Sequence, residues 1–255
     1  MFIPRYGSGA RWFSVLLFTI SLGWGMGARA APPSDSPQSL SGMYKQAVAS
    51  SVRTDEDRDA DAGRKPLEFL QFTKVQPGMR VLDIAAGAGY STQLLALVAG
   101  AGGTVYAQGQ KLRPALEDRL AKHPQANIVP DVRPFDDPVP GDAPKLDLVT
   151  IIFNYHDISY LPVDRAKMNQ RLFGALKPGG HLVVIDHSAK AGTGTSVAET
   201  LHRIDEAVVR KELLQAGFKL EEESDYFRNP ADPRDQPIFK TSVPVDNFAL
   251  RFVKP

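Results

Sequence analysis

The chain has 255 residues and an almost balanced charge, with 30 lysines and arginines against 29 aspartates and glutamates, and it contains no cysteine. The missing cysteines exclude disulfides and a lipoprotein anchor. The balanced charge gives no electrostatic reason to expect binding to nucleic acid or to an anionic membrane surface, and the length suffices for one sizeable core.

The first thirty residues are typical of a secretory signal peptide. Arg5 and Arg11 precede an apolar run over residues 12–26, and residues 28–30 read Ala-Arg-Ala, a small-x-small cleavage pattern. The run is too short for a comfortable membrane span. We therefore expect a leader over residues 1–30, export to the periplasm, and no stable membrane anchor once the leader is removed. An uncleaved membrane anchor is the alternative.

Residues 31–63 are expected to form an N-terminal tail and a helical extension, followed by one domain over residues 64–255. Between residues 53 and 65 acids alternate with arginines, and Asp57, Asp61 and Lys65 lie at the i, i+4 spacing of a helix. This pattern is more typical of a solvated, ion-paired helix face than of a ligand clamp.

Beyond this segment, apolar and β-branched runs alternate with amphipathic helical patterns. Residues 146–153 are almost continuously apolar, as in a strand that is buried on both faces. The alternation predicts an α/β fold with a doubly wound, mostly parallel sheet, whose ligand crevice lies at the carboxyl ends of the first and fourth strands. The expected strands cover residues 80–84, 103–107, 127–129, 146–153, 181–186, 218–223 and 248–253, and the expected helices cover residues 67–72, 91–98, 113–122, 168–176 and 204–216.

Residues 81–90, which read Val-Leu-Asp-Ile-Ala-Ala-Gly-Ala-Gly-Tyr, are the most informative stretch. An apolar strand ends in an acid, small residues follow, and a helix begins, which is the local build of a nucleotide-binding βα unit. Small residues let the backbone approach a ligand closely, and Asp83 could accept hydrogen bonds from a ligand ammonium or hydroxyl group. The alternative is a tight turn that packs the helix on the sheet and binds nothing.

Three segments, in order, resemble the class I S-adenosylmethionine-dependent methyltransferases. Residues 81–89 resemble the first motif of that family, residues 176–184 the segment before and within its fifth strand, and residues 213–218 the junction of a helix with its sixth strand. The resemblance implies a seven-stranded Rossmann-like sheet with an antiparallel last strand. Residues 154–157 and 201–205 are also similar to a group of exported bacterial proteins whose methyltransferase activity is predicted largely from their fold.

The resemblance implies S-adenosylmethionine as the cofactor and gives roles to individual residues. Ala85 stands where the family usually has its first glycine, a mild change if its φ is negative. The family usually ends its second strand in an acid that holds the ribose, but here Gln108 and Gln110 offer only amides, which are weaker partners. Asp136 or Asp137 lies near where adenine is often contacted, or else caps a turn. The expected cofactor contacts are Asp83 at the methionine end, Ala85, Gly87, Gly89, Gln108, Asp136 and Asn154.

Methyl transfer from a sulfonium is an in-line displacement, so the enzyme mainly aligns the reacting atoms, and a base is needed only for a protonated acceptor. His156 follows the fourth strand beside the expected methyl position. We predict it as the base or acceptor-orienting group, supported by Asp157 and Tyr155; alternatively it only hydrogen-bonds the loop backbone. His187 and His202 could join His156 and aspartates in a metal site, but no tight ligand spacing supports one, so no metal ligand is expected.

Together these patterns predict an exported enzyme that transfers a methyl group from S-adenosylmethionine to a small-molecule acceptor. The cofactor is made in the cytoplasm, whereas the leader directs the chain out of it. This conflict, with the missing acid after the second strand, keeps open a non-catalytic envelope protein that binds a nucleoside-like or other ligand in the same crevice. A weaker third possibility is another enzyme on this fold, such as a nicotinamide-dependent reductase or a metal-assisted hydrolase.

Overall fold

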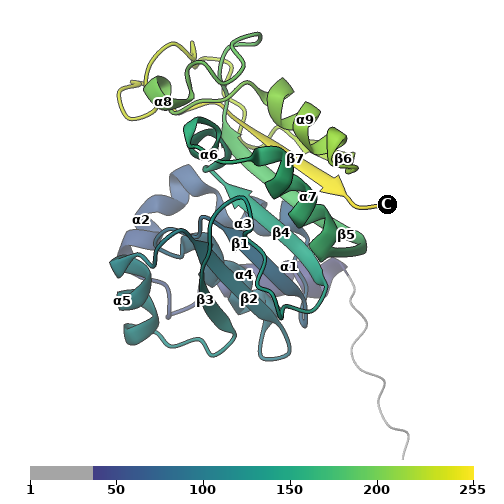
Figure 1. Cartoon of the computed structure of the whole chain (residues 1–255). Helices are drawn as coiled ribbons and strands as arrows, with labels where there is room; N and C mark the ends of the chain where they lie inside the picture. Colours follow the sequence, from purple (N-terminus) through teal and green to yellow (C-terminus); the bar gives the residue numbers. More distant parts are fainter. Residues whose placement is uncertain (1–36) are drawn as a thin grey trace, which may run out of the picture. The chain divides into compact units, whose positions relative to one another are not determined.

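A computed structural model describes residues 37–255 of the protein (Figure 1). The predicted leader and the first part of the predicted tail lie outside these residues. None of the helices within them has both the length and the apolar character that a membrane crossing needs. The helices are α1 Pro37–Val48, α2 Asp55–Arg64, α3 Pro66–Thr73, α4 Tyr90–Ala99, α5 Pro114–Lys122, α6 Tyr155–Tyr160, α7 Arg165–Ala175, α8 Ala198–Leu201 and α9 Glu206–Gln215.

One seven-stranded sheet organises the described residues. Its strands are β1 Arg80–Ile84, β2 Thr104–Gly109, β3 Ile128–Val132, β4 Leu146–Ile152, β5 Leu176–His187, β6 Lys219–Ser224 and β7 Asn247–Val253. Their order is β3-β2-β1-β4-β5-β7-β6, and only β7 runs antiparallel to its neighbours. The predicted doubly wound, mostly parallel sheet with an antiparallel last strand is confirmed. Its order reverses between β1 and β4, so the ligand crevice of such a sheet lies at their carboxyl ends.

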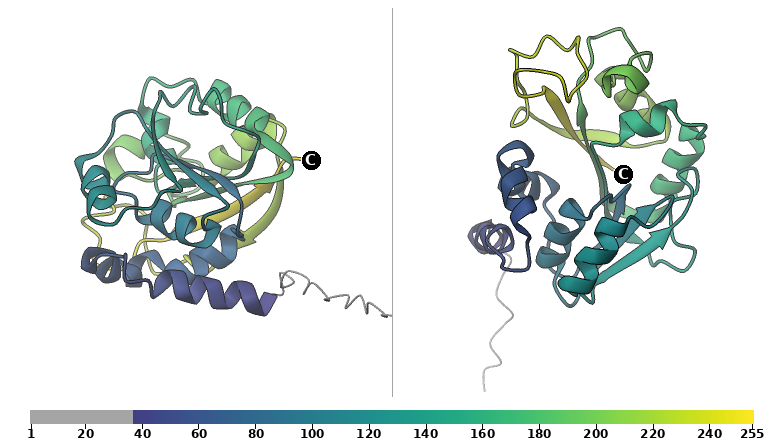
Figure 2. Two further views of the ribbon diagram at one scale, coloured as in Figure 1. Left: turned by 90° about the horizontal axis from the view of Figure 1, so that it is seen from below. Right: turned by 90° about the vertical axis from the view of Figure 1, so that its left-hand side faces the viewer.

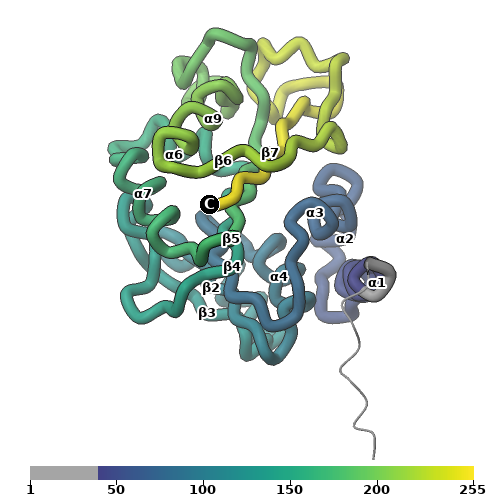
Figure 3. Tube along the Cα trace, turned by 90° about the vertical axis from the view of Figure 1, so that its right-hand side faces the viewer, coloured from purple at the N-terminus to yellow at the C-terminus, as the bar shows by residue number. Residues whose placement is uncertain are grey.

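Helices cover both faces of the sheet (Figure 2, Figure 3), and two clusters of apolar side chains are buried between the helices and the sheet. On one face α1, α3 and α4 pack together, with Tyr44 and Leu94 in their cluster. On the other face lie α7 and α9, with Leu172 in the second cluster. β4 contributes Leu148 to the first cluster and Val149 to the second. This alternation confirms that β4 is buried on both faces.

Most charged residues of α2 are exposed, as predicted for a solvated helix face, but two charged residues of the segment are buried. Asp57 is 4% exposed and Arg53 is 3% exposed. The carboxylate oxygens of Asp57 accept hydrogen bonds from Arg119 of α5 at 2.6 and 2.7 Å, and Arg53 donates to Asp61 at 2.9 Å. The spacing within α2 is correct for a helix, but Arg119 is 62 residues away from Asp57, and no local pattern can indicate such a partner.

Several element boundaries differ from the sequence prediction by a few residues, and those of β5 and β3 differ most clearly. β5 begins at Leu176, directly after α7, so residues 178–180, which were expected to terminate the helix, lie inside the strand. β3 runs to Val132 rather than ending at residue 129. The longer β3 places Asp131 in register beside Gln108 of β2, at the edge of the sheet where the crevice lies.

Candidate functional site

The loop between β1 and α4 contains three residues with positive φ: Ala85 at 54°, Gly87 at 60° and Gly89 at 86°. Hydrogen bonds to β2 fix this conformation, because the Ala85 N–H donates to Oε1 of Gln108 at 3.1 Å and the Ala86 N–H donates to its carbonyl oxygen at 2.9 Å. Ala85 thus adopts a left-handed conformation that suits glycine. The condition for a mild replacement, a negative φ, is not met.

Replacing Ala85 with glycine should therefore raise the free energy of unfolding by about 0.5–1 kcal/mol. Alanine in the left-handed region costs about 1–2 kcal/mol, and the greater freedom of glycine in the unfolded chain offsets part of the gain. Urea unfolding measures the difference. Ala88→Gly in the same loop is the matched control, because Ala88 has no positive φ, and it should lower stability. A glycine variant at position 85 no more stable than the parent would contradict the strain.

Asp83 lies near the carboxyl end of β1, in the crevice. Its Oδ2 accepts a hydrogen bond from the hydroxyl of Thr92 at 2.6 Å, and its Oδ1 accepts one from the hydroxyl of Thr150 at 2.7 Å. Burial outweighs these two hydrogen bonds and raises the pKa of Asp83 to about 6. The side chain lines a cavity of about 260 Å³ that also reaches Arg64 and Tyr90. A carboxylate in this position attracts an ammonium group.

The raised pKa of Asp83 predicts a stability difference that depends on pH. The pKa rises from 3.8 to about 6 on folding, so the folded state binds more protons in this window and loses stability as the pH rises through it. Asp83→Asn should match the parent below about pH 4 and exceed it above about pH 6, by up to about 3 kcal/mol. Urea unfolding on both sides of the window tests this. A difference in unfolding free energy between Asp83→Asn and the parent that stays constant with pH would contradict the raised pKa of Asp83.

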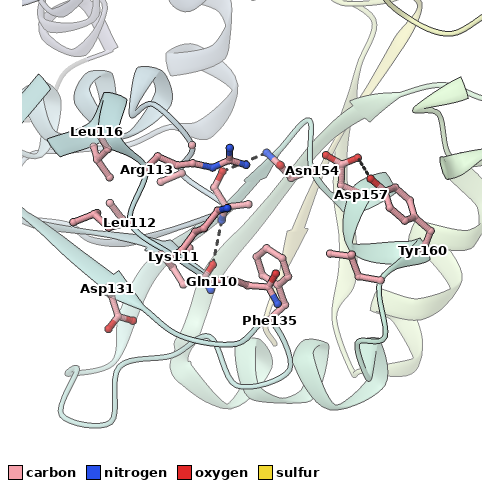
Figure 4. A pocket seen from close by; sticks show the side chains of 17 residues that line it. Gln110, Lys111, Leu112, Arg113, Leu116, Asp131, Phe135, Asn154, Asp157 and Tyr160 are labelled. Atoms are coloured by element: carbon pink, nitrogen blue, oxygen red, sulfur yellow. Dashed lines mark hydrogen bonds between the residues drawn. The ribbon is translucent and has the colours of Figure 1, made fainter. Parts of the chain in front are cut away.

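A larger cavity, of about 460 Å³, begins at the same loop and runs past the ends of β2 and β3 to α6 (Figure 4). Gly87, Gln108 and Asn154 line it, as expected of cofactor contacts. The amide of Gln108, however, is already engaged: its Oε1 accepts from Ala85, and its Nε2 donates to the carbonyl oxygen of Arg133 at 2.7 Å. Gln108 therefore links two segments that border the cavity, the loop after β1 and the segment after β3.

The other predicted glycine has a packing role. Gly89 lines neither cavity among the described residues, and a Cβ built on it would lie 2.7 Å from Cδ1 of Leu116. Together with its φ of 86°, which strains any other residue, this close approach of α5 favours glycine at position 89 without a direct ligand contact.

Asp131 is a cavity residue that the sequence prediction missed. It lines the larger cavity, and burial raises its pKa. Its Oδ2 is buried and has no hydrogen-bond partner among the described residues, although Nε of Arg133 lies 3.3 Å away as an ion pair. A buried carboxylate oxygen without a partner is costly and marks a place for a ligand donor. The available signal was the acid itself, which follows the apparent end of the third strand. The sequence prediction ended that strand at residue 129, although it runs to Val132.

Asp136, predicted in this role, lies elsewhere. It pairs with Lys167 at 3.0 Å, and Asp137 pairs with Arg171 at 2.7 Å. Both carboxylates thereby tie the segment after β3 to α7 on the surface, and neither lines the cavity. Asp131, which does line the cavity, lies five residues earlier, because β3 is longer than its apolar run indicates.

Arg64 is the second residue that the sequence prediction missed. Its guanidinium lies 5.4 Å from the ring centroid of Tyr90 and 5.1 Å from that of Phe153, and burial lowers its pKa. Within residues 37–255 no carboxylate or hydrogen-bond acceptor pairs with this side chain. Arg64 lines the same small cavity as Asp83. It is therefore a cation available to an anionic ligand, and only tertiary packing reveals it.

His156 lies at the carboxyl edge of β4 between two carboxylates. Its Nδ1 lies 2.6 Å from Oδ1 of Asp186, and its Nε2 lies 3.0 Å from Oδ1 of Asp157. Burial opposes a charge on the ring, but Asp186 and Asp157 outweigh it and raise the pKa of His156 to about 10. A ring that holds its proton is a poor base at neutral pH, so the geometry favours the orienting form of the predicted role. The role itself stays a prediction.

The partners predicted for His156 separate in the structure. Asp157 lines the larger cavity and accepts a hydrogen bond from the hydroxyl of Tyr160 at 3.1 Å (Figure 4). Tyr155 instead points into the core, where its hydroxyl donates to Glu212 at 2.7 Å and accepts from Asn169 at 2.8 Å. Because consecutive helical residues point in different directions, α6 presents Asp157 to the cavity and Tyr155 to α7 and α9. Tyr155 is thus not part of this site.

His202 joins the same rim from the end of α8. Its Nδ1 lies 3.2 Å from Oδ1 of Asp157, so the structure brings His156, Asp157 and His202 together although the sequence separates them widely. His187 lies beside His156 but forms a different interaction, because its Nδ1 donates to the side-chain oxygen of Asn247 at 2.5 Å. Burial lowers the pKa of His187 to about 4.

A third cavity, of about 620 Å³, adjoins the small one. Arg64 and Phe153 line both of them. Its walls combine the aromatic rings of Phe153 and Phe227 with polar groups from His187, Arg228, Asn229 and Asn247. Its volume falls within the range of small-molecule sites, which is about 300–1,000 Å³.

Comparison with known proteins finds similarity to methyltransferases. Residues 62–130, which include β1, the glycine-containing loop and β2, match the family Protein-L-isoaspartate(D-aspartate) O-methyltransferase. The ubiquinone/menaquinone biosynthesis C-methyltransferase UbiE of Burkholderia multivorans is 28% identical over 175 residues, which are 66% of this chain and 67% of that protein.

Solved structures share the fold at low identity. A SAM-dependent methyltransferase from Aquifex aeolicus has a TM-score of 0.55 at 18% identity and covers 80% of this chain and 100% of its own. The glycopeptide N-methyltransferase MtfA, solved with sinefungin, has a TM-score of 0.54 at 17% identity over 79% of this chain and 86% of its own. These likenesses establish the architecture, and the chemistry of the crevice must be argued from its residues.

Proposed function

We propose that this chain is a class I S-adenosylmethionine-dependent methyltransferase that transfers the methyl group of S-adenosylmethionine to a small-molecule acceptor. The observation that carries the proposal is the charge pattern of the crevice. Arg64, whose guanidinium has no acidic partner among residues 37–255, lines the cavity at one side of the glycine-containing loop. Asp131 lines the cavity at the other side, and its buried Oδ2 accepts no hydrogen bond from these residues, with only Nε of Arg133 as an ion pair 3.3 Å away.

This pattern complements S-adenosylmethionine, which supplies an electrophilic methyl group and has a carboxylate and an ammonium at one end and hydroxyl and amino donors at the other. Arg64 would hold the carboxylate through charge-assisted hydrogen bonds, and Asp83 would attract the ammonium. Asp131 would accept a hydrogen bond from the adenosine. Asp131 thus supplies, from β3, the acid that is missing at the end of β2.

The third cavity is the proposed acceptor site. It meets the small cavity at Arg64 and Phe153, so an acceptor there would approach the methionine end of the cofactor. The chain's contribution to the reaction is alignment and exclusion of water. His156 and Asp157 are proposed to orient the acceptor at the rim.

A cavity-filling substitution tests this acceptor site. Val245 lines the third cavity, so Val245→Trp should abolish transfer of label from radioactive S-adenosylmethionine to the low-mass fraction of a cell extract. The affinity for S-adenosylhomocysteine should not change. Val243→Trp in the same segment is the matched control, because Val243 does not line the cavity. Label in the protein or nucleic-acid fraction would contradict a small-molecule acceptor, and binding without any transfer would favour the non-catalytic alternative.

We also propose that the chain is exported through residues 1–30, which rests on their sequence pattern. Fractionation of the producing bacterium, followed by mass spectrometry, tests this location. The proposal expects a periplasmic protein that begins at Ala31. A full-length cytoplasmic protein would refute it and would also remove the conflict with the cytoplasmic origin of the cofactor.

A further inference from the structure

We propose that His156, Asp157 and His202 form a binding site for a divalent transition metal ion of the zinc type. One donor atom of each residue lies within 4.8 Å of the other two. Oδ1 of Asp157 lies centrally, 3.0 Å from Nε2 of His156 and 3.2 Å from Nδ1 of His202. Metal–ligand bonds of about 2.0–2.1 Å at tetrahedral angles place neighbouring donors about 3.3 Å apart. The two donor pairs that include Asp157 are therefore already close to the separation that an ion requires.

An outer carboxylate orients the buried ligand. Asp186 accepts hydrogen bonds from Nδ1 of His156 at 2.6 Å and from its backbone N–H at 2.7 Å. This arrangement leaves Nε2 of His156 directed at Asp157, and a carboxylate behind a histidine is the usual support of a metal ligand. A bound ion would take the place of the proton on Nε2, which would be released to solvent.

His202, the third ligand, has an unfavourable backbone conformation. His202 caps α8 with a φ of 53°, a left-handed conformation that is unfavourable for a residue other than glycine. Its ring packs against that of Phe239, with centroids 5.0 Å apart. The conformation directs the ring back to the rim, where its Nδ1 reaches Asp157.

The ligand set decides the class of ion. Two imidazoles and one carboxylate suit zinc and similar ions, whereas magnesium and calcium prefer oxygen ligands alone. Three protein ligands leave a fourth position open, as in catalytic zinc sites. The buried ligand is His156, whereas the side chains of Asp157 and His202 are 36% and 28% exposed, so the open position faces the rim. Asp157 also lines the larger cavity, in which the cofactor is proposed to bind. This places the ion beside the proposed reaction site.

Calorimetric titration of purified, metal-stripped protein with zinc tests the site without any measurement of activity. We expect one ion per chain at micromolar affinity, no competition from magnesium in large excess, and an at least tenfold loss of affinity in His202→Ala. Substitution with cobalt should give the visible absorption of a tetrahedral site, and this absorption should be lost in the same variant.

His181 provides a matched control. Its Nε2 pairs with Glu221 at 3.2 Å, but no second histidine joins that pair, so His181→Ala should bind zinc like the parent. His202 is preferred to His156 for the test because removal of His156 would leave Asp186 buried without its partner. Circular dichroism confirms that the variants are folded. Absence of zinc binding by folded parent protein, or equal binding by parent and His202→Ala, would overturn the proposal.

Discussion

Replacing Arg119 with methionine should lower the free energy of unfolding by about 3–5 kcal/mol, because it breaks a buried ion pair and leaves one charge without compensation. The guanidinium binds both carboxylate oxygens of Asp57 at 2.6 and 2.7 Å. It also donates to Oε1 of Gln93 at 2.6 Å and to the carbonyl oxygen of Ala88 at 2.7 Å. Arg119 therefore joins α5 to α2, to α4 and to the glycine-containing loop, and its loss should also weaken cofactor binding.

The exposed ion pair between Lys74 and Glu222 provides the control, since its atoms lie 3.2 Å apart but both side chains reach solvent. Lys74→Met should change stability by less than about 1 kcal/mol. Urea unfolding compares the two variants. In the Arg119→Met background, Asp57→Asn should recover part of the loss, because it removes the stranded charge. Equal effects of the buried and exposed substitutions would contradict this account of α2.

Arg64→Leu should weaken the binding of S-adenosylhomocysteine by about 10- to 100-fold, which corresponds to hydrogen bonds to a charged group worth about 1.5–3 kcal/mol. The same variant should bind 5′-methylthioadenosine, which has no carboxylate, as well as the parent does. The stability of the ligand-free protein should be unchanged or higher, because the guanidinium has no partner among the described residues and its burial lowers its pKa.

Arg58 lies on the same helix and provides the matched control. It is exposed, pairs with Asp55 and donates to the carbonyl oxygen of Arg53, and it lines none of the three cavities, so Arg58→Leu should leave both affinities unchanged. Calorimetric titration with the two ligands separates the outcomes. If Arg64→Leu weakens both ligands equally, its effect is not on the carboxylate and the proposed orientation of the cofactor is wrong.

The parts of the fold and site that could be predicted from sequence are those encoded locally. The alternation of strands and helices gives the sheet, and the short stretch around Asp83 and Gly87 gives the turn at the crevice, because both depend on neighbouring residues. Asp136, predicted near adenine, does not line the cavity, and Asp131 was overlooked for a local reason. β3 includes the polar Asp131, so its apolar run understates its length.

The rest of the site depends on contacts between distant segments. Arg64 is left without an acidic partner among residues 37–255 only when α2 packs beside Tyr90, whereas the surrounding run of acids indicates ordinary surface pairing. His156 and His202 meet only after α6 and α8 come together. The direction of Tyr155 depends on which face of α6 is buried, and a six-residue helix is too short for its periodicity to show that face.

The most direct test of the account is calorimetric titration of the purified, folded protein with S-adenosylhomocysteine, with Asp131→Asn measured in parallel. The account predicts one bound molecule per chain at micromolar affinity and a clear loss of affinity in the variant. Absence of binding at saturating concentrations would contradict the methyltransferase assignment of the crevice while leaving the fold intact.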